Sequence, residues 1–104
     1  FSSTNWNQRP LGVQVLALAY RSGEAWNEAG FANKEFDSLL SQALSVPDAD
    51  ERRKIMAKIE AIMQDEGVII QPYWRSLYRH NKPGLVNAEM HPAFEFHPEK
   101  IWWS

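Results

Sequence analysis

The sequence predicts an α+β fold, a helical hairpin packed on a small mixed or antiparallel sheet. Two consecutive segments between residues 33 and 67 repeat apolar residues at the spacing of one helical face. The chain then changes to β-branched and aromatic residues, which favour strands. With 104 residues it can bury one hydrophobic core, so we expect a single domain over residues 1–104.

The composition excludes several classes of protein. The net charge is −2, so the chain has no basic field and we expect no nucleic-acid partner. Because there is no cysteine, disulfide frameworks and thiolate metal sites are excluded. The longest apolar run, residues 15–20, is too short to span a bilayer.

The first element is expected directly after Pro10, a residue suited to the first turn of a helix. The apolar residues that would share one helical face are Leu11, Val15, Leu18 and Ala19. Leu11, Val13 and Val15 also alternate, which leaves a strand open. Residues 21–23 are expected to end this element, and the small and polar residues 24–32 then predict a loop.

The first helix of the hairpin is expected to begin after Asn33, a favourable N-cap residue. Its buried stripe would consist of Phe36, Leu39, Leu40, Ala43 and Leu44. Pro47 disfavours helical geometry at the residue before it, so the helix should end at Val46.

The second helix of the hairpin is expected to begin after Asp48, with Glu51 placed to complete a capping pair. Asp50 and Lys54 have the spacing of a favourable ion pair. The apolar stripe would consist of Ile55, Ile59, Ile62 and Met63. Gly67 is the expected C-terminal stop.

A strand is expected over residues 68–79, which combine β-branched and aromatic residues. Pro72 cannot donate to a sheet, which suggests an edge or a bulge. Residues 81–84 predict a turn, so the small sheet is expected within residues 68–96. The closing Trp102 and Trp103 are expected to dock on the rest of the chain.

No pattern in the sequence indicates catalysis, a metal or a cofactor. The carboxylates fall mostly on the polar faces and first turns of the two helices, as in solvated helices. Glu95 and His97 would share a strand face and are the one His/carboxylate pair that a metal site or an enzyme lobe could use. Scattered surface histidines are the simpler interpretation. We therefore expect a protein that is not an enzyme.

Two short segments combine tryptophan with asparagine in regions expected to be irregular. Asn5 and Trp6 form one of them, and Trp26 and Asn27 form the other. Large flat apolar surfaces with a few directional amides are typical of small-molecule clefts. The alternative is that both tryptophans fill the core, which is the commoner fate of this residue in a small domain.

These residues lie within a longer resemblance. The chain resembles the C-terminal portion of the family 5 extracellular solute-binding proteins, the dipeptide, oligopeptide and nickel receptors of ABC importers. The resemblance covers essentially the whole chain. The stretches that carry it are YRSGEAWNE at 20–28, GFANKEFDSLL at 30–40, DERR at 50–53, DEGVIIQP at 65–72 and IWW at 101–103.

The resemblance implies one part of a two-lobed periplasmic-binding-protein clamshell, a C-terminal fragment of a larger protein. Such a protein closes around a peptide-like or other small polar solute in the periplasm or outside the cell, and docks on an ABC permease in the membrane. In peptide-binding relatives, the segment before the proline-led helix lines the cleft and often carries an acidic residue. The matching residues 3–9 contain no carboxylate but do contain Arg9, which suits an anionic group. The expected ligand-binding residues are therefore Asn5, Trp6, Arg9, Trp26 and Asn27.

The alternative function is that of a free-standing protein-interaction module. Its binding surface would be an exposed aromatic patch made of Trp74, Tyr78, Trp102 and Trp103. If the chain is instead part of a larger receptor, apolar surface is uncovered in the isolated chain. We then expect the isolated chain to self-associate.

Overall fold

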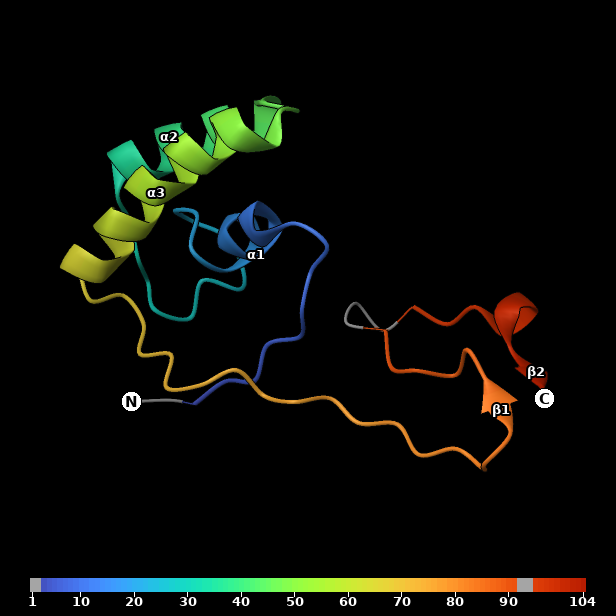
Figure 1. Cartoon of the computed structure of the whole chain (residues 1–104). Coiled ribbons are helices and arrows are strands. Elements are labelled where there is room, and N and C mark those ends of the chain that lie inside the picture. The colour runs from blue at the N-terminus through green and yellow to red at the C-terminus, as the bar shows by residue number, and fades with distance from the viewer. Residues whose placement is uncertain (1–2, 92–94) are drawn as a thin grey trace. The chain divides into compact units, whose positions relative to one another are not determined.

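The computed structural model describes residues 3–91 and 95–104, which belong to two compact units. One unit is Arg9–Pro72 and contains the helices α1 (Gly12–Ala19), α2 (Lys34–Ser45) and α3 (Ala49–Asp65). The other consists of the N-terminal residues up to Gln8 together with Tyr73–Ser104. Each unit is described by itself (Figure 1).

The helical hairpin of α2 and α3 is confirmed, with α3 packed along α2 and α1 against α2 (Figure 1). The Asn33 side chain accepts a hydrogen bond from the Phe36 N–H at 3.0 Å, which caps α2 as expected. Val46, the residue before Pro47, is extended and ends the helix.

Both ends of α3 lie where the sequence places them, although the Glu51 side chain pairs with Lys54 instead of completing a capping pair with Asp48. The Asp48 carboxylate accepts from the N–H groups of Asp50 at 3.0 Å and Glu51 at 2.8 Å. At the other end, Gly67 takes a φ of 59° and the Val68 N–H donates to the Met63 carbonyl at 3.3 Å. This is a Schellman ending, which glycine supports because it adopts positive φ without strain.

One expected ion pair on α3 is wrong. Asp50 pairs with Arg53 at 2.8 Å instead of with Lys54. Lys54 pairs with Glu51, also at 2.8 Å. Residues three apart on a helix are neighbours just as residues four apart are, so each carboxylate takes the nearer cation. The Glu51 side chain therefore pairs with Lys54, while the Glu51 backbone N–H donates to Asp48.

The first element is the helix α1, and the strand that the sequence left open does not form. The Leu11 N–H donates to the Gln14 side chain at 3.3 Å across its first turn. The buried residues of this region are Val13, Ala19 and Tyr20. The expected face is therefore only partly right, because Leu11 and Leu18 are exposed.

The core of the helical unit lies between α2 and α3. Phe36, Leu40 and Ile59 are completely buried, and the rings of Phe31 and Phe36 meet edge to face at 5.1 Å. Leu39 and Ala43 are also buried, as the periodicity predicts. Leu44 is the exception and is 46% exposed. Within the described residues, no helix is long and apolar enough to cross a membrane.

The second unit contains a short antiparallel ribbon. Strand β1 (Leu85–Val86) pairs with β2 (Trp102–Trp103), with Leu85 opposite Trp103. The Ser104 N–H donates to the Gly84 carbonyl at 2.8 Å, and a 3₁₀ turn at Pro98–Lys100 leads into β2. Trp102 and Trp103 pair with β1 through their backbone groups, but the two residues are 54% and 64% exposed, so the expected docking of the two rings is wrong.

The strand expected over residues 68–79 is wrong. These residues carry no strand assignment, and the described part of the chain forms its sheet from β1 and β2 alone. Strand-favouring residues form a strand only where a neighbour pairs with their backbone groups, and β1 pairs with β2 instead. Residues 92–94 of the expected sheet region lie outside the described residues.

Candidate functional site

The loop between α1 and α2 is closed by the side chain of Asn27. Its Nδ2 donates to the carbonyl of Arg21 at 3.1 Å and to the carbonyl of Phe31 at 2.7 Å. Its Oδ1 accepts from the Phe31 N–H at 3.0 Å. Both amide hydrogens and the carbonyl are therefore engaged within the loop, which fixes the two ends of residues 21–31 to each other.

The same loop is tied to α2 by Asp37. The Asp37 carboxylate accepts a hydrogen bond from the Ser22 N–H at 3.1 Å. Asp37 lies in the first turn of α2, where its negative charge also complements the helix dipole. Together, Asn27 and Asp37 turn a polar, glycine-containing loop into a fixed structure.

Trp26 is carried by this loop and is 54% exposed. The alternative interpretation, in which Trp26 fills the core, is therefore wrong. A broad aromatic surface on a fixed loop can contact a ligand without the cost of ordering the loop on binding. Asn27, beside it, positions the loop through the hydrogen bonds described above.

Asn5 and Trp6 lie in the other unit, where Asn5 is exposed and Trp6 is half-buried. Arg9, Trp26 and Asn27 belong to the helical unit. Neither unit by itself therefore brings together the five expected residues. A site that uses all of them stays a prediction.

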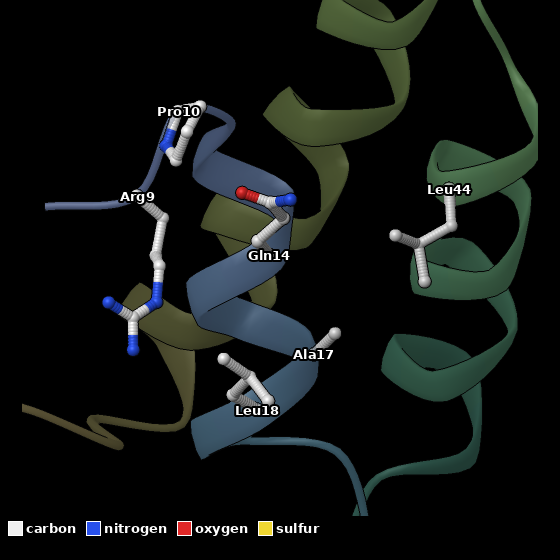
Figure 2. A pocket seen from close by; sticks show the side chains of 6 residues that line it. All are labelled: Arg9, Pro10, Gln14, Ala17, Leu18 and Leu44. Carbon is white, nitrogen blue, oxygen red and sulfur yellow. The ribbon is translucent and has the colours of Figure 1, made fainter. Parts of the chain in front are cut away.

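Arg9 lines an open depression on the helical unit, together with the start of α1. The depression measures about 400 Å³, and its lining residues are Arg9, Pro10, Gln14, Ala17, Leu18 and Leu44 (Figure 2). Its walls are mostly apolar, with one guanidinium and one amide as polar groups. This combination can hold an apolar group that ends in a carboxylate, because a guanidinium binds a carboxylate through two parallel hydrogen bonds.

The sequence names Arg9 as a ligand-binding candidate but does not name Gln14, Leu18 or Leu44, which line the same depression. Leu18 and Leu44 were expected on buried stripes, and their residue type is that of core leucines. The signal that they share is their position at the margin of each stripe, where a helical face begins to turn toward solvent. Gln14 carried no signal, because amides are common on exposed helical faces.

Two side chains have shifted pKa values. Burial, with a smaller contribution from the charge of Glu28, raises the pKa of Tyr20 above its ordinary value of 10.0. In the other unit, a hydrogen bond from its own backbone and the neighbouring His97 lower the pKa of Glu99. Tyr20 does not line the depression, and Glu99 belongs to the other unit.

The expected pair of Glu95 and His97 does form. The His97 ring lies 3.2 Å from a Glu95 oxygen through Nε2 and 3.1 Å from a Glu99 oxygen through Nδ1. His91 lies 4.0 Å from the same Glu95 oxygen. Over the described ranges, however, no group of three or more His, Cys, Asp or Glu could hold a metal ion. The contacts are those of an exposed polar network.

Comparison with known proteins places the chain beside bacterial binding proteins. It is 36% identical over 75 residues to the dipeptide-binding protein DppE of Bacillus subtilis (strain 168), a match that covers 72% of this chain and 14% of DppE. The chain is similar to solute-binding proteins. It is also 23% identical over 90 residues to the probable deoxycholate-binding periplasmic protein YgiS of Escherichia coli (strain K12).

The matches are partial on the side of the relatives. The chain spans 14% of the length of DppE and 17% of the length of YgiS. No protein-family model matches the chain, and no solved structure matches it significantly. Both relatives are named as binding proteins rather than as enzymes. The similarity therefore supports a solute-binding role at a coarse level.

Proposed function

We propose that this chain belongs to the substrate-binding component of an ABC importer and takes part in binding a peptide-like or other small polar solute for uptake. The observation that carries the proposal is the 36% identity to DppE, which extends over 72% of the chain. The proposed location is the periplasm or the cell exterior, since YgiS is named a periplasmic protein. The proposed membrane partner is an ABC permease.

In this proposal the chain forms the C-terminal part of a two-lobed clamshell of the family 5 type. Closure of the lobes around a solute needs no chemistry, because the solute favours the closed state through the extra contacts it makes there. The fixed loop at residues 21–31 suits such a role. Its hydrogen bonds to Asn27 and Asp37 hold Trp26 in place before any solute arrives.

The proposed ligand contacts differ in chemistry. Trp26 and Trp6 offer flat apolar surfaces, Asn5 offers an amide, and the Arg9 guanidinium offers a site for an anionic group. Asn27 acts by holding the loop, since its amide is engaged. An uncharged solute body with one carboxylate matches this set.

The test is native mass spectrometry of the protein purified from its own cells without refolding. The expected result is a stoichiometric adduct whose mass identifies a peptide or another small polar molecule. A preparation that carries no adduct, and that binds neither dialanine nor deoxycholate by calorimetry, overturns the proposal. Those two probes correspond to the solutes in the names of the relatives.

A variant pair tests the role of Trp26 in binding. Trp26→Ala is expected to weaken binding of the identified solute about tenfold, the scale of a lost aromatic contact. Trp74→Ala is the matched control, because Trp74 lies in the other unit and is 88% exposed. Equal affinity of the two variants would remove Trp26 from the site.

The exposed aromatic residues of the second unit favour a second candidate function, a protein-interaction module. Trp74 and Tyr78 are 88% and 78% exposed, and both tryptophans of β2 are more than half exposed. Large exposed apolar surfaces often mark interaction sites. Absence of any bound solute, together with concentration-dependent assembly, would favour this candidate over the receptor.

A further inference from the structure

The 3₁₀ turn that leads into β2 begins directly after a histidine. The His97 carbonyl accepts a hydrogen bond from the Lys100 N–H at 3.0 Å, which closes the turn at Pro98–Lys100. The Lys100 carbonyl in turn accepts from the side chain of Asn87, the residue after β1, at 3.1 Å. The turn therefore connects His97 to the short ribbon of β1 and β2.

The His97 ring lies between two carboxylates. Its Nε2 is 3.2 Å from a Glu95 oxygen, and its Nδ1 is 3.1 Å from a Glu99 oxygen. Both distances are those of hydrogen bonds. Because an ionised carboxylate can only accept, both contacts are hydrogen bonds only if both ring nitrogens donate. The charged imidazolium is the form of histidine that has two N–H groups.

The neutral form of His97 cannot make both hydrogen bonds. Neutral imidazole has one N–H and one bare nitrogen, so one of the two carboxylates then faces a lone pair. That contact is repulsive and favours movement of the carboxylate away from the ring. The lead into the 3₁₀ turn therefore has one hydrogen bond more when His97 is charged.

The other charged groups near this ring are His91 and Lys100. His91 Nε2 lies 4.0 Å from the same Glu95 oxygen, and its ring meets the His97 ring edge to face at 6.2 Å. A hydrogen bond from its own backbone, followed by His97 and the charge of Lys100, lowers the pKa of Glu99. Because His91 is farther from Glu95 than His97 is, His97 is the residue that joins the two carboxylates.

The pH range of the extra hydrogen bond follows from the ordinary chemistry of the groups. A glutamate ordinarily ionises near about pH 4.3, and a histidine ordinarily loses its charge near about pH 6.5. Between these values the carboxylates are ionised while the imidazolium persists. The extra hydrogen bond is thus present in mildly acidic solution. It is lost as the pH rises and histidine becomes neutral.

We propose that His97, Glu95 and Glu99 form a pH-dependent latch on the 3₁₀ turn. The charged ring bridges both carboxylates, and the neutral ring releases one of them. A two-stranded ribbon is only marginally stable by itself, so one hydrogen bond at its entry changes how often it opens. The contacts that carry the proposal lie within one unit of the chain and involve no solute.

Amide hydrogen exchange, followed by NMR on the full chain, tests the latch. The N–H groups to follow are those of Lys100, which closes the turn, and Ser104, which donates to the Gly84 carbonyl at the end of the ribbon. Each rate is divided by that of an unstructured peptide at the same pH. Both amides are expected to be about two- to fivefold better protected at about pH 5.5 than at about pH 8, the scale of an exposed charged pair.

Two histidine substitutions separate the latch from other effects of pH. His97→Gln removes the charge, so its protection should be the same at both pH values. His80→Gln is the matched control and should keep the full difference, because His80 is an exposed histidine of the same unit. The amides of α2 report whether either variant alters the fold. Equal protection of the parent chain at the two pH values overturns the proposal, as does a difference that survives in His97→Gln or is lost in His80→Gln.

Glu99→Gln tests the role of the second hydrogen bond. The new amide can accept from a ring N–H through its oxygen or donate to a bare ring nitrogen through its NH₂ group. The contact then forms in both charge states of His97, so the pH difference in protection should fall to about half or less. A difference as large as that of the parent chain overturns the proposal. No solute is present in these experiments, so their outcome is separate from that of the receptor proposal.

Discussion

The Asp37 carboxylate accepts a hydrogen bond from the Ser22 backbone N–H at 3.1 Å, and this contact joins two segments fifteen residues apart. Ser22 begins the loop after α1, whereas Asp37 lies in the first turn of α2. The contact therefore sets where the loop leaves the helical core. Because the loop carries Trp26, it also sets where that aromatic surface lies.

Replacement of Asp37 is expected to loosen this attachment. Asp37→Ala leaves the half-buried Ser22 N–H without its acceptor, so we expect a loss of about 1–2 kcal/mol in the free energy of unfolding. Asp50→Ala is the control, because Asp50 lies in the first turn of α3 and pairs only at the surface, with Arg53. That variant should lose less than about 0.5 kcal/mol in urea denaturation. Equal losses would show that Asp37 acts only through the helix dipole.

Two adjacent arginines on α3 are expected to differ in importance. The Arg52 guanidinium donates to the Val46 carbonyl at 2.8 Å and so closes the link between α2 and α3. Arg53 pairs only with the exposed Asp50. Arg52→Met should therefore lower the free energy of unfolding by about 1–2 kcal/mol, and Arg53→Met by less than about 0.5 kcal/mol. Thermal unfolding of both variants measures the difference, and a reversed order would contradict this role of Arg52.

The helical hairpin could be predicted from the sequence because its signals are local. Asn33, Asp48 and Gly67 each act on backbone groups within a few residues, so their effect is readable from spacing alone. The burial of residues at the edge of each apolar helical face was harder to predict. Leu44 continues the periodicity of α2 but is 46% exposed, since burial also depends on what another element covers.

The sheet could not be predicted because strands depend on distant partners. Residues 68–79 have the side chains of a strand but pair with no other strand among the described residues. The two-residue strand of Trp102 and Trp103 pairs instead with Leu85 and Val86. Within the candidate site, the residue type of Trp26 was enough to suggest a contact with a ligand. It could not show that Asn27 is engaged within the loop, because the carbonyls of Arg21 and Phe31 converge only after folding.

Alkaline pH is expected to destabilise the helical unit through Tyr20. Burial raises the pKa of this phenol above 10.0, so the folded state favours the protonated form. The resulting stability is fully present below pH 10.0 and is lost as the pH rises through the folded-state pKa. The difference in phenolate absorbance between the parent chain and Tyr20→Phe gives the titration of this residue. Its midpoint should lie above 10.0, and a midpoint at or below that value would contradict the burial of Tyr20.

The last prediction concerns the loop that carries Trp26. Trypsin cleaves after arginine, and the Arg21 carbonyl is held by the Asn27 side chain at 3.1 Å. Asn27→Ala removes all three hydrogen bonds of that side chain, so residues 21–31 should open locally more often than the helical core does. Cleavage after Arg21 should become at least several-fold faster. Cleavage after Arg53, within α3, should change less.

The matched control is Asn81→Ala, because Asn81 is exposed in the other unit. Asn27→Asp adds a graded variant, since it keeps the acceptor for the Phe31 N–H but loses both donated bonds. Its cleavage rate should fall between those of the parent chain and Asn27→Ala. If the parent chain, Asn27→Ala and Asn27→Asp were all cleaved after Arg21 at the same rate, the hydrogen bonds of Asn27 would not hold the loop. The fixed presentation of Trp26 would then need another cause.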